Sequence, residues 1–302
     1  MRDTPGPVLA ALLTVQVLFA SLHVVGKVVL AELAPLALAG TRVAIATPIL
    51  LIFAWRHDRC VPARRDWPRL ALLGMLGIFA NQTLFLLGLS FTSATSSAIL
   101  MPSIPVLTAG AAAILGVERV AGRRLAGIAL AAAGAVVLLD PTRLDTGARA
   151  TIGNALILSN CLAYSFFLVL LRPLLARIPW RTAIAWCFLF GSIGTLAFAA
   201  PAMASADWGA LSTGARAAVL FIGVFPTALN FALNTWAVRH SSPAVVAAFT
   251  TLQPVFTSAL AAVWLGESMS ANQLAGFALI VLGLVLVQRK IPRAVGAGIG
   301  DI

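Results

Sequence analysis

The sequence predicts an all-α membrane protein with ten transmembrane helices, arranged as two inverted five-helix repeats around a central cavity. Three observations support this fold class: a composition that is 60% apolar and only 10% charged, ten long apolar windows, and a segment that recurs in the second half of the chain. A soluble domain has about 25% charged residues. A chain with so few charges has too little polar surface to cover a globule, so we expect most of it to lie in a lipid bilayer.

The net charge of +11 comes from short arginine tracts between the apolar windows. This pattern is typical of contact with an anionic membrane surface. Nucleic-acid binding instead requires a basic patch on a soluble face, so no nucleic acid is expected as a partner. The three cysteines, Cys60, Cys161 and Cys187, have neither disulfide nor metal-ligand spacing, and we expect no metal and no cofactor.

Ten windows are long and apolar enough to cross a bilayer, which takes about 20 residues. In chain order they cover residues 8–30, 33–55, 69–90, 93–116, 125–140, 151–171, 182–201, 217–238, 243–265 and 274–288. The first window is longer than the apolar core of a signal peptide and further spans follow it, so we expect a transmembrane helix there. Several connections are very short, which predicts antiparallel neighbours.

Arginine and lysine mark the cytoplasmic side of a membrane protein. With the N-terminus inside, most of the 21 basic residues fall in inner segments, and the outer segments contain only Lys27, Arg143, Arg149 and Arg216. Both termini are therefore expected in the cytoplasm.

The segment LMPSIPV, from Leu100 to Val106, lies in a region that recurs farther along the chain. Pro105 aligns with Pro254 and Glu118 with Glu267, which divides the chain into repeats at residues 1–142 and 149–290. Five spans are an odd number, so the second repeat must enter the membrane from the opposite side. The basic loop VERVAGRR agrees, because its counterpart GESMSANQ has no basic residue. Inverted repeats are a recurrent transporter architecture with the binding site near the midplane.

Pro102, Pro105 and Pro254 lie in the middle of the fourth and ninth spans. Proline in a helix interior costs about 3 kcal/mol. One interpretation is a static kink, which transmembrane helices tolerate. The other is a pair of hinges that let the helix ends bend and open a central site to each side in turn.

The pattern of Lys27, Arg42, Thr92 to Ala94, Pro105, Glu118, Gly127 and Gly134, together with its second copy, resembles the EamA-type members of the drug/metabolite transporter superfamily. The resemblance covers almost the whole chain. It implies ten helices made of two five-helix units, in a protein of the bacterial cytoplasmic membrane. Such proteins are commonly exporters of amino acids or related metabolites.

Polar residues at mid-depth are costly in hydrocarbon and tend to face the interior of a helix bundle. The candidates for substrate binding are His23, Arg42, Asn81, Gln82, Tyr164, Asn230, Asn234 and Gln253. Each has a plainer interpretation: Arg42 as a tie to helix-end carbonyls, His23 as a packed histidine, the amides as links between helices. The fifth and tenth spans have glycine stripes and no polar residue, so we expect them outside the cavity. Lys27 is expected to extend its amine to the outer interface.

We expect a secondary transporter that exports amino acids or similar small zwitterionic metabolites, with a nucleoside, sugar or other metabolite permease of the same fold as the alternative. All ten acidic residues fall in tails, loops or span ends. This disfavours an exporter of lipophilic cations, which needs a buried acid, and favours facilitated diffusion or weak coupling through His23. An enzyme is not expected, because His23, His57 and His240 are scattered, and there is no ATP-binding GxxxxGK[ST] motif.

Overall fold

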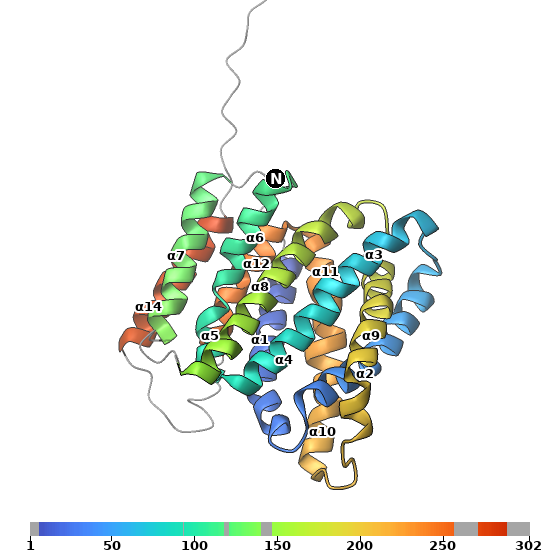
Figure 1. The fold of residues 1–302 in the computed structure, drawn as a ribbon. Coiled ribbons are helices and arrows are strands. Elements are labelled where there is room, and N and C mark those ends of the chain that lie inside the picture. Colours follow the sequence, from blue (N-terminus) through green and yellow to red (C-terminus); the bar gives the residue numbers. More distant parts are fainter. Residues whose placement is uncertain (1–5, 93, 118–120, 140–146, 257–270, 289–302) are drawn as a thin grey trace, which may run out of the picture.

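The computed structural model describes residues 6–92, 94–117, 121–139, 147–256 and 271–288, and these ranges contain helices and no β-strand (Figure 1). Glu118 and Glu267, aligned above, lie outside the described residues, as does the end of the ninth expected span. The helices pack side by side in one bundle, with α7 and α14 together at one edge (Figure 1).

The first half of the chain contains α1 (Gly6–Leu30), α2 (Pro35–Asp58), the 3₁₀-helix η1 (Arg64–Asp66), α3 (Trp67–Gly74), the π-helix η2 (Met75–Ala80), α4 (Asn81–Phe91), α5 (Ala94–Leu100), α6 (Ser103–Ile114) and α7 (Gly122–Leu139). The second half contains α8 (Ala148–Leu175), α9 (Trp180–Ala204), α10 (Thr213–Ile222), the π-helix η4 (Gly223–Leu229), α11 (Asn230–His240), α12 (Pro243–Ala248), the 3₁₀-helix η5 (Phe249–Leu252) and α14 (Ala271–Gln288).

Within the described residues, six helical segments are long and apolar enough to cross a membrane. They are α1, α2, the run from η1 to α4, α8, α9 and the run from α10 to α11. The other four expected spans correspond to the pair α5 and α6, to α7, to α12 with η5, and to α14. Two of these four are interrupted where proline or a 3₁₀ turn breaks the helix, and apolar windows in the sequence do not show such breaks.

The prolines of LMPSIPV end one helix and begin another, since α5 stops at Leu100 and α6 starts at Ser103. Pro105 lies in the first turn of α6, where a missing N–H costs nothing because that group has no partner within the helix. The Ile104 N–H turns back to the Met101 carbonyl at 3.0 Å, and the Cys161 thiol of α8 donates to the Leu100 carbonyl at 3.9 Å. The break is therefore satisfied by the neighbouring helix.

The described residues of each half contain one π-helix, and an asparagine directly follows each, Asn81 after η2 and Asn230 after η4. Short π segments inside α-helices are rare and often mark functional sites. In η4 the Thr227 hydroxyl donates to the Ile222 carbonyl at 2.7 Å, which spans the wider π turn.

Glycines allow the backbones of α7 and α14 to pack in direct contact. A Cβ atom on Gly127 would lie 2.8 Å from the Gly283 carbonyl oxygen, and one on Gly134 would lie 2.8 Å from the Gly276 carbonyl oxygen. Small residues at such contacts allow close approach of helices in membranes. None of these four glycines contacts the centre of the bundle, as the glycine stripes predicted.

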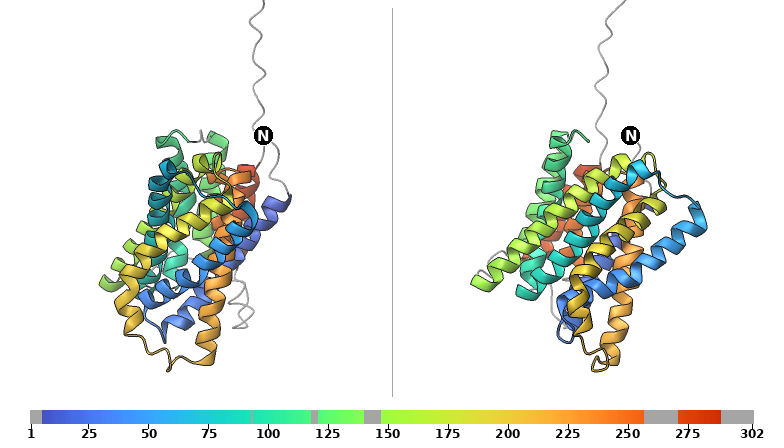
Figure 2. Two further views of the ribbon diagram at one scale, coloured as in Figure 1. Left: turned by 90° about the vertical axis from the view of Figure 1, so that its right-hand side faces the viewer. Right: turned by 45° about the vertical axis from the view of Figure 1, so that its right-hand side comes forward.

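Two basic side chains each donate hydrogen bonds to the carbonyls at the end of a neighbouring helix. The Lys27 amine, near the end of α1, donates to the Leu89 and Thr92 carbonyls at the end of α4, at 3.0 and 3.2 Å. The Arg172 guanidinium, near the end of α8, donates to the Val238 carbonyl at the end of α11 at 3.0 Å, and to the next carbonyl. Because α1 and α8 run in opposite directions, these contacts lie at opposite ends of the bundle (Figures 1 and 2).

Lys27 is expected to extend its amine to the outer interface, and the structure adds that this amine binds carbonyls at the end of α4. The last carbonyls of a helix have no partner in that helix and carry partial negative charge, so a nearby cation binds them. We call the Lys27 contact the α1–α4 latch and the Arg172 contact the α8–α11 latch.

Carboxylates join other helix ends. Asp58 at the end of α2 accepts from Arg181 at 3.1 Å and from the Thr182 N–H, and so caps the start of α9. At the opposite end, Glu32 accepts hydrogen bonds from the backbone N–H and hydroxyl of Ser212, both at 2.8 Å. These hydrogen bonds, the backbone one first, hold the pKa of Glu32 below its usual range.

Candidate functional site

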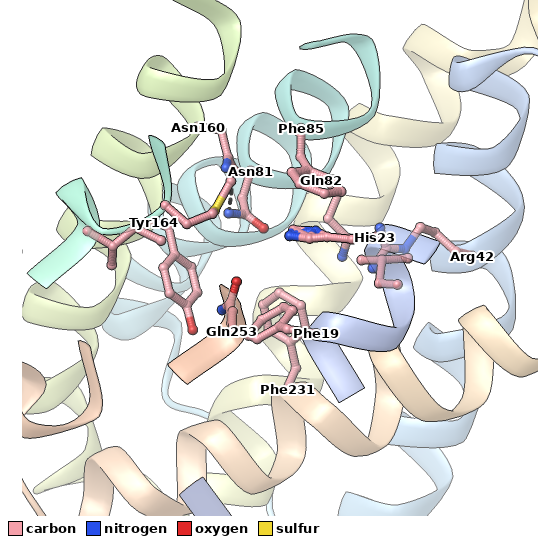
Figure 3. Close-up of a pocket in the computed structure, with 13 residues that line it drawn as sticks. Phe19, His23, Arg42, Asn81, Gln82, Phe85, Asn160, Tyr164, Phe231 and Gln253 are labelled. Carbon is pink, nitrogen blue, oxygen red and sulfur yellow. Dashed lines mark hydrogen bonds between the residues drawn. The ribbon is translucent and has the colours of Figure 1, made fainter. Parts of the chain in front are cut away.

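A small cavity of about 40 Å³ lies at the centre of the bundle, walled by α1, α2, α4, α6, α8, α11 and the segment after η5 (Figure 3). Its lining mixes polar and apolar side chains: Phe19, Leu22, His23, Arg42, Asn81, Gln82, Phe85, Met101, Ile104, Asn160, Tyr164, Phe231 and Gln253. A mostly apolar wall with a few converging polar groups is typical of a site for a small organic molecule.

Arg42 forms one part of the wall, and only 2% of the residue is exposed. Its Nε donates to the Thr227 hydroxyl of η4 at 2.9 Å. The acidic side chains of the described residues, Glu32, Asp58, Asp66 and Asp207, all lie in loops or at helix ends. Within the described part of the chain, the Arg42 guanidinium thus has no carboxylate partner at this depth, and it contacts a hydroxyl rather than helix-end carbonyls.

His23 lies between Arg42 and the centre of the cavity in Figure 3. Its ring stacks on Phe85 with 5.2 Å between centroids, and 3% of the residue is exposed. Within the described part of the chain, neither ring nitrogen has a hydrogen-bond partner, and neither does either amide atom of Gln82. Buried polar groups are normally paired, so these atoms are available to a ligand or to water.

Other amides of the wall are paired across helices. Asn81 donates to Asn160 of α8 at 2.6 Å, and Gln253 donates to Gln16 of α1 at 3.1 Å. These two contacts join the two halves of the chain at the cavity, as the interpretation of the amides as interhelical links predicts.

Aromatic rings close the remaining wall. Phe19 meets Tyr164 and Phe231 edge to face, with centroids 6.3 and 6.5 Å apart. Tyr164 also stacks on Phe167, with 6.1 Å between ring centroids. The cavity therefore offers apolar and aromatic surface next to amides, a phenol, an imidazole and a guanidinium.

The structure brings six of the eight expected site residues to one cavity: His23, Arg42, Asn81, Gln82, Tyr164 and Gln253. Asn230 and Asn234 are not among the residues that line it, and a role of either in substrate binding stays a prediction. Both are buried in α11, and among the described residues neither amide atom of Asn230 has a hydrogen-bond partner. A position along a helix does not determine which face of that helix meets the cavity.

Sequence reasoning missed the apolar lining residues Phe19, Leu22, Met101 and Ile104. Phe19 lies one helical turn before His23, Leu22 directly precedes His23, and the last two flank the break at Pro102. Helix periodicity and the proline positions could have identified them.

All three prolines expected to act as hinges lie next to lining residues. Pro102 follows Met101, Pro105 follows Ile104, and Pro254 follows Gln253. Both interrupted helices thus reach the cavity at their interruption.

A bundle of apolar, membrane-length helices around a polar cavity, with interrupted helices at that cavity, is the architecture of a multi-pass membrane transporter. The chain belongs to the EamA-like transporter family, which matches residues 6–140 and again residues 151–289.

Named relatives agree with this assignment. Protein WALLS ARE THIN 1 of Arabidopsis thaliana is 29% identical over 92% of this chain and 81% of that protein. The probable terminal-alkyne amino-acid exporter of Streptantibioticus cattleyicolor is 29% identical over 83% of this chain and 82% of that protein. The uncharacterized transporter YetK of Bacillus subtilis is 27% identical over 90% and 84%. A protein of known crystal structure shares the fold, with a TM-score of 0.74 at 19% identity over 92% of this chain and 95% of that chain.

Proposed function

We propose that this protein exports amino acids or similar small zwitterionic metabolites across the bacterial cytoplasmic membrane by alternating access. The observation that carries the proposal is the Arg42 guanidinium, buried in the cavity wall with no carboxylate beside it in the described residues. A buried charge without a partner is strongly unfavourable. A substrate carboxylate would supply the partner through charge-assisted hydrogen bonds.

The remaining groups suit the other parts of such a solute. Amide and phenol oxygens of the wall accept hydrogen bonds from an ammonium, and the faces of Phe19 and Phe231 attract a cation or pack an apolar side chain. The relative from Streptantibioticus cattleyicolor, named a probable amino-acid exporter, supports this substrate class.

The cavity of about 40 Å³ has room for about three water molecules, at roughly 10–15 Å³ of such volume for each. An amino acid needs more space, so the walls must move apart to admit it. We propose that residues 1–142 and 149–290 are inverted repeats of five helices each, that both termini are cytoplasmic, and that Pro102, Pro105 and Pro254 are the hinges. The family matches in each half and the two opposed latches support this arrangement.

We further propose that export is uncoupled or only weakly coupled to protons, through His23. The test is uptake into inside-out vesicles with and without a pH gradient. Strong dependence on the gradient that survives His23→Ala would contradict this part of the proposal.

The experiment for the substrate class uses the full-length protein in proteoliposomes. Uptake of a neutral amino acid is compared with uptake of its carboxamide analogue, which lacks the carboxylate. Arg42→Gln should lower amino-acid uptake about tenfold or more, because a hydrogen bond to a charged group contributes about 1.5–3 kcal/mol and 1.4 kcal/mol is tenfold. Uptake of the carboxamide should change little.

Two controls separate recognition from folding. Thr227→Val removes the hydrogen bond that holds Arg42 but keeps the guanidinium, so it should retain the preference for a carboxylate. Equal uptake of both solutes by the unmodified protein would refute the role of Arg42. A growth panel with overexpression extends the test, since protection against nucleoside or sugar analogues but against no amino acid would favour the alternative permease.

A further inference from the structure

A second, larger space of about 790 Å³ lies between the first half of α1 and the second half of α2, with η4 and α11 behind it. We call it the α1–α2 groove; Ala10, Ile49, Phe53, Trp180, Phe225 and Trp236 are among its lining residues. It shares no lining residue with the central cavity. From the geometry and chemistry of this groove, we propose that it binds one phospholipid with an anionic headgroup, whose acyl chain fills the groove and whose phosphate lies at its mouth.

The interior of the groove is suited to a hydrocarbon chain and not to a polar solute. Thr14 is the one lining residue with a side-chain hydroxyl, and this hydroxyl already donates to the Ala10 carbonyl at 2.9 Å. The tryptophans donate only through their ring N–H groups, and the other lining residues are aliphatic, proline or phenylalanine. A water-soluble metabolite would lose its hydration there without compensation.

At the mouth of the groove, basic side chains pack on aromatic rings. The Arg181 guanidinium lies 4.7 Å from the Trp180 ring centre and 5.6 Å from that of Phe53. His57 packs on Phe53 at 4.6 Å, and His240 packs on Trp236 at 4.7 Å.

Arg56 and Arg239, next in sequence to these histidines, are exposed. Asp58, the carboxylate nearby within the described residues, is already engaged by Arg181 and by the start of α9. Among the described residues the mouth is therefore basic, and it complements a phosphate.

The position of the groove along the helices favours a lipid over other amphiphiles. The groove begins at helix ends, with Pro7 of α1 and Trp236 of α11, and reaches the middle of helices at Thr14 and Phe225. Tryptophan is enriched where membrane meets water. An occupant with its charge at the helix ends and its hydrocarbon toward mid-membrane has the orientation of a bilayer lipid.

The test uses the full-length protein reconstituted with phosphatidylglycerol or phosphatidylcholine that has a photoreactive diazirine in one acyl chain. Labelled peptides are mapped by mass spectrometry. Phosphatidylglycerol should label the lining segments of α1 and η4 several-fold more than phosphatidylcholine does. Ala10→Trp, a change at an exposed position inside the groove, should reduce that labelling about fivefold or more, and Val28→Trp, exposed on α1 but outside the groove, should leave it unchanged.

A second pair of variants tests the headgroup. Arg56→Gln with Arg239→Gln should remove most of the preference for phosphatidylglycerol, whereas Arg64→Gln with Arg65→Gln, which removes the same charge from η1, should keep it. Equal labelling by both lipids, equal effects of the two arginine pairs, or undiminished labelling in Ala10→Trp would overturn the proposal. Displacement of the lipid by transported amino acids would overturn it too, because the groove would then belong to the substrate path.

Discussion

The two latches predict opposite and measurable changes in the access of the cavity to the two sides of the membrane. Lys27→Met removes the α1–α4 latch and leaves the α8–α11 latch intact, and Arg172→Met does the reverse. Each latch consists of hydrogen bonds from one half-buried cation to helix-end carbonyls.

Hydrogen bonds to charged groups contribute about 1.5–3 kcal/mol each. Because both cations are partly exposed, we take the lower value of about 1.5 kcal/mol for a whole latch. About 1.4 kcal/mol is a tenfold change in an equilibrium. Loss of one latch should thus raise the population open at that end about tenfold.

The reporter is Met101→Cys, which places a thiol in the cavity wall, in a background where the three native cysteines are replaced. A membrane-impermeant thiol reagent is applied from either side of oriented vesicles. Lys27→Met should increase labelling about tenfold from the side where α1 ends, and Arg172→Met from the opposite side. Arg216→Met and Arg64→Met remove exposed charges at the corresponding ends without touching a latch and should change nothing. Equal labelling from both sides after either latch variant would indicate general loosening and refute the reasoning.

Three further changes test packing, charge and bending. Gly191→Ala should destabilise the protein by about 1–2 kcal/mol in thermal unfolding, because the new Cβ atom would lie 2.6 Å from the Cβ atom of Ile78. Gly110→Ala should be neutral or stabilising, because a Cβ atom there would have nothing within 4 Å. Glu32→Gln should lower the Tm at neutral pH but not in acid, because hydrogen bonds at the start of α10 keep the folded pKa of this carboxyl below its ordinary value of 4.5. The contribution of Glu32 to stability is therefore present above pH 4.5 and is lost as the pH falls through the folded pKa. A Tm difference that persists in acid would argue against this. Replacing both Pro105 and Pro254 by Ala should slow transport more than it lowers folded yield, and unchanged transport would leave only a static kink.

The membrane class and the polar centre could be predicted from the sequence because both depend on composition and depth. Six of the apolar windows are membrane-length helices in the structure. His23, Arg42 and Gln82 line the central cavity, as expected for polar side chains that are costly to place in lipid. The family resemblance was confirmed by the matches in both halves of the chain.

The directions of side chains and the partners of helix ends could not be predicted from the sequence. Asn234 is buried in α11 but does not line the cavity, because rotation about a helix axis depends on packing with several neighbours. The Lys27 latch and the α1–α2 groove likewise arise between segments far apart in the chain. The ten-helix inverted arrangement, the hinges and the substrate stay predictions.

The glycine contacts between α7 and α14 have a consequence for the origin of this architecture. In the sequence alignment Gly127 corresponds to Gly276 and Gly134 to Gly283, and the structure pairs Gly127 with Gly283 and Gly134 with Gly276. A surface that meets its own counterpart in this crossed manner is self-complementary. Under the proposed inverted arrangement of the two halves, a single five-helix unit inserted in both orientations would already have the surface needed to assemble with a copy of itself.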